Sequence, residues 1–345
     1  MRSDARPVAG LRVVVLGGTG FVGRHVVEGF AALGASVLPV SRTGGHAGAR
    51  VRPPLRLDLL AATPGRIAGM LGEAGADVVV NAAGQVWRSD EEQMAAGNAA
   101  LVERLLTALA SMPGDPPRLV QLGTVHEYGA GAPDAGTGED HPPAPVTAYG
   151  RTKLLGTRAV LGAVQERGVD AVVLRLANVI GSGVPEGSLF GRVAAHLGAA
   201  AHAVRRGGRA AELRLPPLRA ARDLVDARDA AAAVLAAATA PGAAVTGRVV
   251  NVGRGEAVPM RGLIDRMVAL SGIRVPVVEE PLSPSSRTDV AWQRLEIARA
   301  GRLLGWRPRR DLDDSLRDLL APVLPPDRPP LGGTVHAPHP EEESP

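Results

Sequence analysis

The fold is decided by residues 11–27, which read LRVVVLGGTGFVGRHVV. An apolar run predicts a buried strand at 11–16, and it leads directly into glycines at positions 17, 20 and 23 and then into a helical pattern. Glycines at this spacing let the backbone turn tightly, approach a pyrophosphate and pack the helix against the strand. A glycine-rich loop is weak evidence in a chain with 43 glycines, but its place after the first strand predicts dinucleotide binding.

Further apolar, β-rich runs alternate with helical patterns through the first half of the chain. They lie at 36–40, 77–81, 119–122 and 171–176. Repeated βαβ spacing of this kind predicts an α/β fold, with a doubly wound parallel sheet of the Rossmann type that is covered on both faces.

The pattern becomes irregular after residue 177. Helices are expected near 188–205, 260–270 and 313–320 and in an alanine-rich stretch from Asp229, with short strands at about 212–215 and 248–252. We therefore expect a dinucleotide-binding Rossmann domain at 1–177, to which some later segments return, and a smaller mixed α/β substrate lobe at 178–321. Proline-rich residues 322–345 are expected to form a disordered tail.

Composition excludes several classes of protein. The chain has 345 residues, of which 45% are hydrophobic, so it can bury a large core. Because it has no cysteine, disulfides, thiol nucleophiles and cysteine-bound metals are excluded. Its 39 basic and 35 acidic residues give a net charge of only +4, which does not predict a nucleic-acid partner. The longest apolar run, 230–240, is about half of the roughly 20 residues that a membrane span needs, and residues 1–10 hold no apolar signal segment. A cytoplasmic protein is expected.

One lysine stands out against this composition. Thirty-eight of the 39 basic residues are arginine, and Lys153 is the only lysine. Tyr149 lies one helical turn before it, so the phenol and the ammonium share one helix face. A neighbouring cation favours the phenolate and is expected to lower the pKa of Tyr149, which makes the tyrosine an acid-base catalyst near neutral pH. A surface pair is the alternative.

The end of the second strand indicates which dinucleotide binds. An acidic residue there would hold the adenosine ribose, whereas this chain has Ser41 and Arg42, which suit the 2′-phosphate of NADP(H). Arg42 could instead be a solvated surface residue. Asp58, after the third strand, could accept from the adenine amino group, or it could be a helix N-cap or an ordinary loop residue.

An ordered set of motifs runs from about Leu11 to Leu320. It comprises the 17–23 loop, Asn81-Ala82-Ala83, Asn98 before a leucine-rich helix, Leu122-Gly123-Thr124 with Tyr128-Gly129, the Tyr149/Lys153 pair, Asn178-Val179-Ile180-Gly181, Arg222-Asp223-Leu224-Val225-Asp226 with Asp229-Ala230, Asn251-Val252-Gly253 and Leu304-Gly305-Trp306-Arg307-Pro308. On these motifs the chain resembles the extended short-chain dehydrogenase/reductases of the NAD-dependent epimerase/dehydratase family, whose members act mainly on nucleotide sugars.

The resemblance implies a role for each matching residue. Thr124 stands in place of the catalytic Ser/Thr, whose hydroxyl binds the reacting oxygen, Tyr149 would be the acid or base, and Lys153 would hold the nicotinamide ribose. Asn98 resembles the helix-borne asparagine of the active site, with a purely structural role as the alternative. The residues expected to contact the cofactor are Gly17, Gly20, Phe21, Val22, Gly23, Ser41, Arg42, Asp58, Leu59, Ala82, Ala83, Asn98, Tyr149 and Lys153.

The residues after Thr124 indicate the reaction. Nucleotide-sugar 4,6-dehydratases have an Asp-Glu pair there, whereas this chain has Val125 and His126, so dehydration is not expected. Glu127 follows, and a strand-like alternation would point it away from His126. Residues 123–129 and 149–154 are similar to those of the 4-ketoreductases of deoxysugar pathways, which implies NADPH-dependent reduction of a dTDP-4-keto-6-deoxyhexose. A 4-epimerase with bound NAD, and an NADP-binding sensor or scaffold without turnover, remain as alternatives.

The resemblance also suggests the substrate-binding residues. Arg222 and Arg287 would hold the diphosphate, and Asn178 the same group or the nearby sugar, with surface charges as the alternative for the arginines. His126 could line the sugar pocket or pack as an ordinary histidine. No aromatic residue lies at 210–218, where the family often stacks the base, so the nucleotide is left open.

Two further expectations concern metals and assembly. No histidine pair has metal-ligand spacing, and Asp223, Asp226 and Asp229 are expected to cap and charge the alanine-rich helix rather than bind a cation. Helices at 91–109 and 147–165 carry apolar residues on more than one face, and in the family they pair across a two-fold axis, which implies a homodimer.

Overall fold

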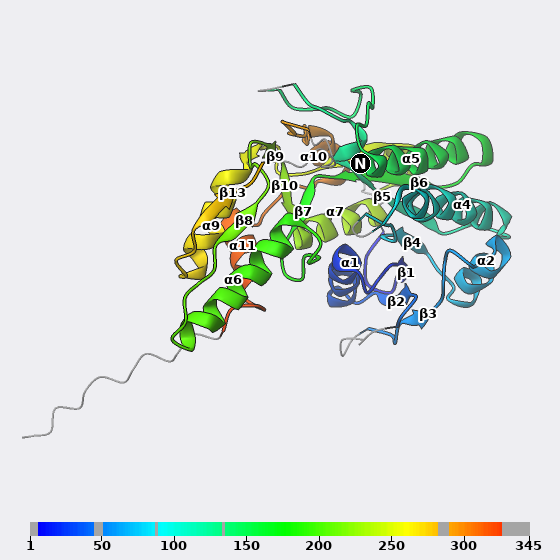
Figure 1. Ribbon diagram of the computed structural model, residues 1–345. Helices are drawn as coiled ribbons and strands as arrows, with labels where there is room; N and C mark the ends of the chain where they lie inside the picture. The colour runs from blue at the N-terminus through cyan, green and yellow to red at the C-terminus, as the bar shows by residue number, and fades with distance from the viewer. Residues whose placement is uncertain (1–5, 45–50, 87–88, 133–134, 282–289, 326–345) are drawn as a thin grey trace, which may run out of the picture.

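The computed structural model describes residues 6–44, 51–86, 89–132, 135–281 and 290–325 (Figure 1). Its centre is a seven-stranded parallel sheet in the order β11-β6-β5-β4-β1-β2-β3. The strands are β1 Arg12–Leu16, β2 Ser36–Ser41, β3 Leu55–Arg56, β4 Val78–Asn81, β5 Arg118–Thr124, β6 Ala171–Leu176 and β11 Val249–Val252. The doubly wound α/β fold is thus confirmed.

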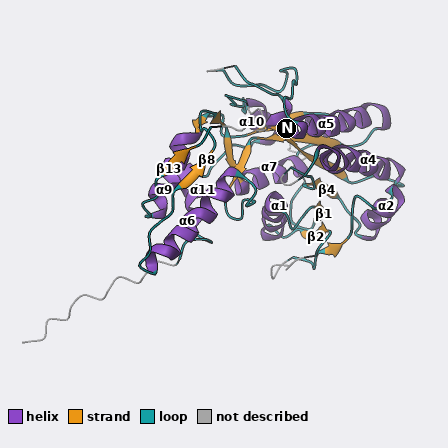
Figure 2. Ribbon diagram, in the orientation of Figure 1, coloured by secondary structure: helices purple, strands orange, loops and turns teal. Residues whose placement is uncertain are grey.

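Helices cover both faces of this sheet, as Figures 1 and 2 show. One face carries α1 (Phe21–Ala32) and α7 (Ala227–Thr239), and the other carries α2 (Pro64–Glu73), α4 (Leu101–Ser111) and α5 (Ala148–Arg167). The alternation of β1 divides its side chains between the two layers. Val13 and Val15 join the core under α1, whereas Val14 and Leu16 join the core under α4.

The strand order reverses between β1 and β4, whose register pairs Leu16 with Asn81. The chain runs from β1 outward to β2 and β3 and then returns to β4 on the opposite side of β1. Because ligands of doubly wound sheets bind at the carboxyl ends of the strands beside such a reversal, this edge is where the cofactor loop is expected to act.

Two segments beyond residue 177 return to the large sheet. The predicted strand at 248–252 is β11, which pairs in parallel with β6 at the edge of the sheet. The alanine-rich helix α7 begins at Ala227, two residues before the expected start, and packs on α1, where Leu235 lies against Gly29. Alanine permits this close approach of helices because its side chain ends at Cβ.

The remaining segments form a smaller lobe with its own apolar core, on the left of Figure 1. Met260, Leu263 and Leu316 are among its buried residues. Its helices are α6 Leu189–Arg205, α9 Met260–Ser271 and α11 Leu312–Leu320, and its strand pairs are β7 Asn178–Ile180 with β10 Leu224–Asp226, β8 Leu213–Leu215 with β13 Val277–Glu279, and β9 Ala221–Arg222 with β12 Val258–Pro259. The other α-helices of the described residues are short: α3 Glu91–Ala95, α8 Gly242–Val245 and α10 Ala298–Leu304. Of the expected 322–345 tail, residues 326–345 lie outside the described residues.

Candidate active site

The glycine loop after β1 forms a close-packed backbone turn against the loop after β4. Gly17 has φ +73°, and a Cβ there would lie 2.9 Å from the backbone N of Ala83. A Cβ on Gly23 would lie 2.1 Å from the Gly17 carbonyl oxygen, so α1 begins directly on the turn. Only glycine fits at these two positions.

The start of α1 suits the pyrophosphate of a dinucleotide. Within the described chain, its N-cap Gly20 makes no side-chain capping bond, and no acidic residue lies in the first turn. The positive end of the helix dipole is therefore available to an anion. Phe21 and Val22, half-buried in the first turn, and Ala82 and Ala83 across the loop border this backbone cradle. The residues at this cradle therefore fit the pyrophosphate of the dinucleotide that the sequence predicts.

Two arginines lie at the adenosine end of the candidate cofactor site. Arg42 is exposed directly after β2, and its carbonyl accepts a hydrogen bond from Arg56 Nε at 3.1 Å. Ser41 is buried, and its hydroxyl donates to the Gly44 carbonyl at 3.0 Å. Sequence reasoning missed Arg56, because its place beside Arg42 depends on the register that pairs Ser41 with Arg56 between β2 and β3.

Asp58 and Leu59 follow β3 on the same edge. Asp58 is exposed and its Oδ1 accepts the Leu60 N–H at 3.0 Å, so the carboxylate stabilises the local turn. Leu59 is 6% exposed and packs in the core under α4, which leaves its backbone for any contact with adenine. Asp58 is thus a loop residue in the structure, as one of the two alternatives predicts, and its contact with adenine stays a prediction.

The proposed catalytic residues meet where β5 ends and α5 begins. Thr124 is the last residue of β5, and the Thr124 hydroxyl hydrogen-bonds the phenol of Tyr149. Thr147 caps α5 by accepting the Gly150 N–H at 3.0 Å. A Cβ on Gly150 would lie 2.3 Å from the His126 carbonyl oxygen, so the first turn of α5 rests directly on the segment after Thr124.

The pKa of Tyr149 differs from the expectation based on its neighbour Lys153. Burial raises the pKa of Tyr149 to about 12, against the opposing effect of the Thr124 hydrogen bond, and the Glu127 charge raises it further. The expected lowering by Lys153 is therefore wrong, because desolvation of the phenolate dominates. Burial also lowers the pKa of Lys153, whose ammonium donates to the Leu122 carbonyl at the end of β5.

The segment after Thr124 is a single 3-10 turn, Val125–Glu127, and not a strand. Thr124 caps it: its Oγ1 accepts the His126 N–H at 3.4 Å, and Glu127 Oε1 accepts the Thr124 N–H at 2.9 Å. The expected strand-like alternation is wrong, since a capping box closes the chain into a turn. The His126 ring nevertheless faces Tyr149, edge to face at 5.8 Å between centroids, while Glu127 is fully buried.

Asn98 links the loop after β4 to α5. It lies in a π-helical turn, Ala96–Ala100, and is 1% exposed. Its Nδ2 donates to the Gln85 carbonyl at 2.8 Å and to Thr152 Oγ1 at 3.1 Å, and its Oδ1 accepts the Gln85 N–H at 2.9 Å. Asn98 thus has the structural role that was the alternative, since its amide bonds Gln85 and Thr152, and its contact with the cofactor stays a prediction.

Two candidate substrate residues, Asn178 and Arg222, lie in strands of the smaller lobe. Arg222 is 5% exposed, and its guanidinium donates to the carbonyls of Ala221 and Val290, so it is not a surface charge. Asn178 Nδ2 donates to the Asp223 carbonyl at 3.0 Å and to Gln293 Oε1 at 3.4 Å. Arg287 lies outside the described residues. Phosphate and sugar contacts of all three remain predictions.

The three aspartates have separate structural roles. Asp226 is the N-cap of α7 and Asp229 lies in the first turn of that helix, so the expected capping is confirmed for Asp226 and the expected charging for Asp229. Asp223 lies outside α7, so the expectation is wrong for this residue. Both Asp223 and Asp229 accept backbone N–H groups from distant loops. Long-range loop packing brings these donors to the carboxylates. Asp223 accepts from Arg254, Gly255 and Leu295, and Asp229 accepts from Arg309 and Arg310. Among the described residues, no group of three or more His, Asp or Glu side chains could hold a metal ion.

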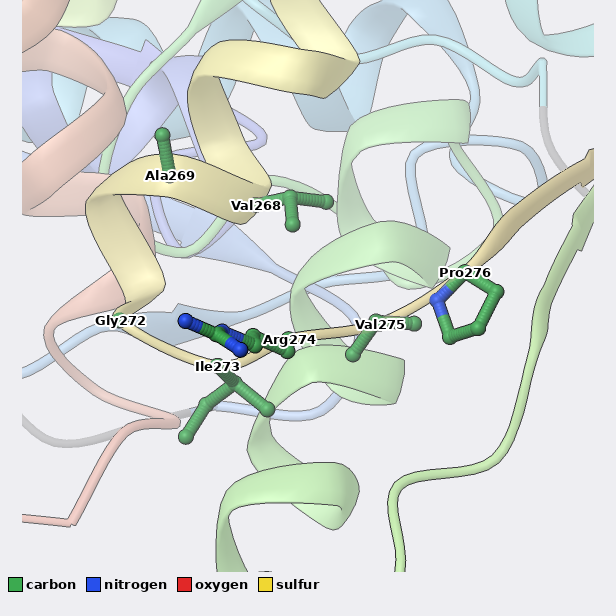
Figure 3. Close-up of a pocket in the computed structure, with 7 residues that line it drawn as sticks. All are labelled: Val268, Ala269, Gly272, Ile273, Arg274, Val275 and Pro276. Atoms are coloured by element: carbon green, nitrogen blue, oxygen red, sulfur yellow. The ribbon is translucent and has the colours of Figure 1, made fainter.

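A surface pocket opens elsewhere, at the end of α9 in the smaller lobe (Figure 3). Residues 268–269 and 272–276 line it, mostly with apolar side chains, and Arg274 is the charged one among them. It contains none of the candidate site residues. Over the residues that the structure describes, no helix is both long and apolar enough to cross a membrane.

Comparison with known proteins places these features in a family context. A model of the NAD dependent epimerase/dehydratase family matches residues 13–253. The chain is 43% identical over 310 residues to dTDP-6-deoxy-L-talose 4-dehydrogenase (NAD(P)(+)) of Kitasatospora kifunensis, covering 89% of this chain and 94% of that protein.

Solved structures share the fold. RMD from Pseudomonas aeruginosa complexed with NADPH matches with a TM-score of 0.73 and 24% identity, over 90% of this chain and 98% of that chain. UDP-glucuronic acid 4-epimerase from Bacillus cereus, in complex with UDP-glucuronic acid and NAD, matches with a TM-score of 0.75 and 20% identity, over 90% and 98%. At these identities the likeness concerns the fold.

Proposed function

Because the chain belongs to the NAD-dependent epimerase/dehydratase family, we propose that it is a nucleotide-sugar oxidoreductase that uses NADPH to reduce the keto group of a dTDP-4-keto-6-deoxyhexose. The observation that carries the proposal is the pairing of Thr124 with Tyr149, four residues before Lys153, at the sheet edge that also holds the glycine loop. The similarity to a dTDP-6-deoxy-L-talose 4-dehydrogenase supports the substrate class, since oxidation of a 4-hydroxyl is the reverse of this reduction.

The residues would act as follows in the reduction. When bound, NADPH supplies the hydride that is added to the sugar C4. The Tyr149 O–H donates its proton to the oxygen of the former carbonyl, so one hydride and one proton convert the ketone to an alcohol. Thr124 donates a hydrogen bond to the same oxygen and orients it toward Tyr149. Lys153 holds a positive charge near the phenol and would bind the nicotinamide ribose.

NADPH, rather than NADH, is favoured by charge at the end of β2. Arg42 and Arg56 lie side by side through the bond between Arg56 Nε and the Arg42 carbonyl, and both are exposed. Two guanidinium groups suit the doubly charged 2′-phosphate, whereas the ribose hydroxyls of NADH are held by an acidic residue in many dinucleotide sites. The hydroxyl of Ser41, which donates to Gly44, brings no negative charge to this position.

The test is an assay of NADPH oxidation with dTDP-4-keto-6-deoxyhexose, followed by absorbance and by identification of the reduced sugar. We expect turnover in the unaltered protein and a loss of about a hundredfold or more in Tyr149→Phe. Tightly bound NAD that survives dialysis, with interconversion of 4-hydroxy sugars and no net oxidation, would instead identify a 4-epimerase. Binding of NADPH without turnover of any keto sugar would identify a sensor or scaffold.

A further inference from the structure

A buried network of four polar side chains, Glu127, Arg175, Tyr128 and Asn251, begins at the Val125–Glu127 turn. Glu127 Oε2 and Arg175 Nε are 2.8 Å apart, and the Arg175 guanidinium carbon lies 4.3 Å from the centre of the Tyr128 ring. The Tyr128 hydroxyl donates to Asn251 Oδ1 at 2.9 Å. Each of the four residues is between 0 and 3% exposed. None of them belongs to the proton- or hydride-transferring set described above.

Glu127 connects this network to the catalytic residues. Its Oε1 accepts the Thr124 N–H at 2.9 Å, while its Oε2 pairs with Arg175, so both oxygens are used. The carboxylate lies so close to the end of β5 that a Cβ on Gly123 would be 2.6 Å from Oε1. The glycine before Thr124 therefore makes room for this carboxylate.

A buried ion pair is an expensive way to fill a core, because both charges lose their hydration and apolar side chains of similar volume are often as stable. A neutral glutamine would satisfy the Thr124 N–H equally well. The charge itself therefore calls for an explanation. One group on which it acts is the Tyr149 phenol, which hydrogen-bonds Thr124.

We propose that Glu127 is a positioning residue of the catalytic site: it fixes the turn that carries Thr124 and, with Arg175 as its counter-ion, sets the electrostatic field at the Tyr149 phenol. The part that concerns reduction rests on the proposed function, because it assumes that Tyr149 acts as the acid.

The direction of the field follows from the groups around the phenol. Lys153 lies on the same helix, His126 and Glu127 come from the turn after β5, and Arg175 comes from β6 behind Glu127. The negative charge of Glu127 favours the protonated form of both Tyr149 and Lys153 and raises the pKa of each. A protonated phenol is the form that donates a proton during reduction.

Glu127→Gln is the decisive variant, since it keeps an oxygen acceptor for the Thr124 N–H and removes only the charge. In the enzyme with NADPH and keto sugar, the alkaline limb of the kcat profile should move to lower pH by about one unit, a roughly tenfold lower rate at a fixed alkaline pH. Glu127→Gln/Arg175→Met, which leaves no uncompensated buried cation, should show a smaller shift in the same direction. KM for the sugar should change little.

A second readout does not need turnover. The chain has two tyrosines, so in a Tyr128→Phe background the phenolate absorbance reports Tyr149 alone. Adding Glu127→Gln to this background should lower the pH at which the phenolate forms, with circular dichroism over the same pH range as the control for folding. This measurement holds whatever the substrate proves to be, so failure of the proposed function can be told apart from failure of this inference.

Unchanged positions of both the kinetic limb and the phenolate titration would overturn the electrostatic part of the proposal. A uniform loss of kcat at every pH, without movement of the limb, would give Glu127 a structural role only.

Discussion

Lys153 is the one lysine in the chain, and its ammonium donates to the Leu122 carbonyl in a buried site one turn beyond Tyr149. Lys153→Arg keeps the charge but adds a larger, planar head with different hydration. We expect this variant to lose most of the NADPH-dependent reduction, about tenfold or more in kcat. Steady-state kinetics with the keto sugar would measure it. A rate equal to that of the unaltered protein would contradict the assignment of Lys153.

Tyr149→Phe removes the proposed proton donor and little of the proposed contact with the cofactor. We expect kcat to fall by about 10²- to 10⁴-fold, the usual range for a general acid, with NADPH affinity kept within a few-fold. Thr124→Val loses one hydrogen bond and keeps the acid, so its kcat should lie between those of the unaltered protein and Tyr149→Phe. NADPH titration by fluorescence, beside the kinetics, separates binding from chemistry. Full turnover of Tyr149→Phe would show that another group is the acid.

Arg42→Ala tests the choice of cofactor. Charged hydrogen bonds to phosphate contribute about 1.5–3 kcal/mol, so the Kd of NADPH should rise by about tenfold or more while that of NADH changes little. Arg56→Ala should act in the same direction. Arg66→Ala, an exposed arginine in the first turns of α2, is the matched control and should leave both constants unchanged. Tighter binding of NADH than NADPH by the unaltered protein would reverse the assignment.

At the scale of the elements, the junction of β1 and α1 depends on Gly23. A Cβ there would lie 2.1 Å from the Gly17 carbonyl oxygen, so Gly23→Ala must push the helix away from the turn. We expect NADPH affinity to fall at least tenfold and the thermal midpoint to drop. Gly69→Ala in α2, where a Cβ would meet nothing within 4 Å, should instead stabilise the protein by about 0.5–1 kcal/mol with unchanged affinity. Equal effects of the two substitutions would contradict this account.

Asp223 joins the loops of the smaller lobe to the main sheet and makes stability depend on pH. Burial raises its pKa to about 6, against three backbone N–H donors that favour the charged form. The folded protein thus binds this proton more tightly than the unfolded chain, so its contribution to stability is full below about pH 4 and is lost as the pH rises toward 6.

Urea unfolding of the unaltered protein and of Asp223→Asn measures this contribution. From pH 4 to 7 the free energy of unfolding of the unaltered protein should fall, relative to the variant, by up to about 3 kcal/mol, at about 1.4 kcal/mol per pKa unit. A difference between the two proteins that does not change with pH would contradict the raised pKa.

Local sequence specified most of the elements, and it failed where distant contacts decide. The run at 171–176 predicts β6 with its observed bounds, because a buried central strand is apolar along its whole length. The turn at Val125–Glu127 was missed, although Thr124 and Glu127 form the Thr-x-x-Glu pattern of a capping box, which was a usable signal. Arg56 carried no local signal, since only strand register brings it to Arg42.

At the scale of the whole molecule, hydrogen bonds join the smaller lobe to the large sheet and its helices. Asp226 at the start of α7 accepts from Ser315 in α11 at 2.7 Å, and Asp229 accepts the backbone N–H groups of Arg309 and Arg310. These bonds involve buried carboxylates far apart in sequence from their donors, which is why α7 was predicted but its partners were not.

Assembly is the remaining question at this scale. By resemblance to the family, helices α4 and α5 are expected to pair across a two-fold axis. Most apolar residues of α4 are buried in the chain's own core. In α5 the apolar residues are divided between buried positions, such as Leu154 and Val160, and more exposed ones, such as Leu155 and Leu161. On the described residues of α4 and α5, Leu155 is the one exposed large hydrophobic side chain, at 52%.

We therefore expect a homodimer whose interface includes Leu155. Leu155→Glu would bury a charge against the symmetry-related helix and should convert the dimer to a monomer, with light scattering at micromolar concentration as the measurement. Leu33→Glu is the matched control, because Leu33 is similarly exposed, at 54%, but lies at the end of α1. Its mass should equal that of the unaltered protein. A monomeric unaltered protein would remove the dimer, and dissociation by Leu33→Glu alone would move the interface to the α1 side of the sheet.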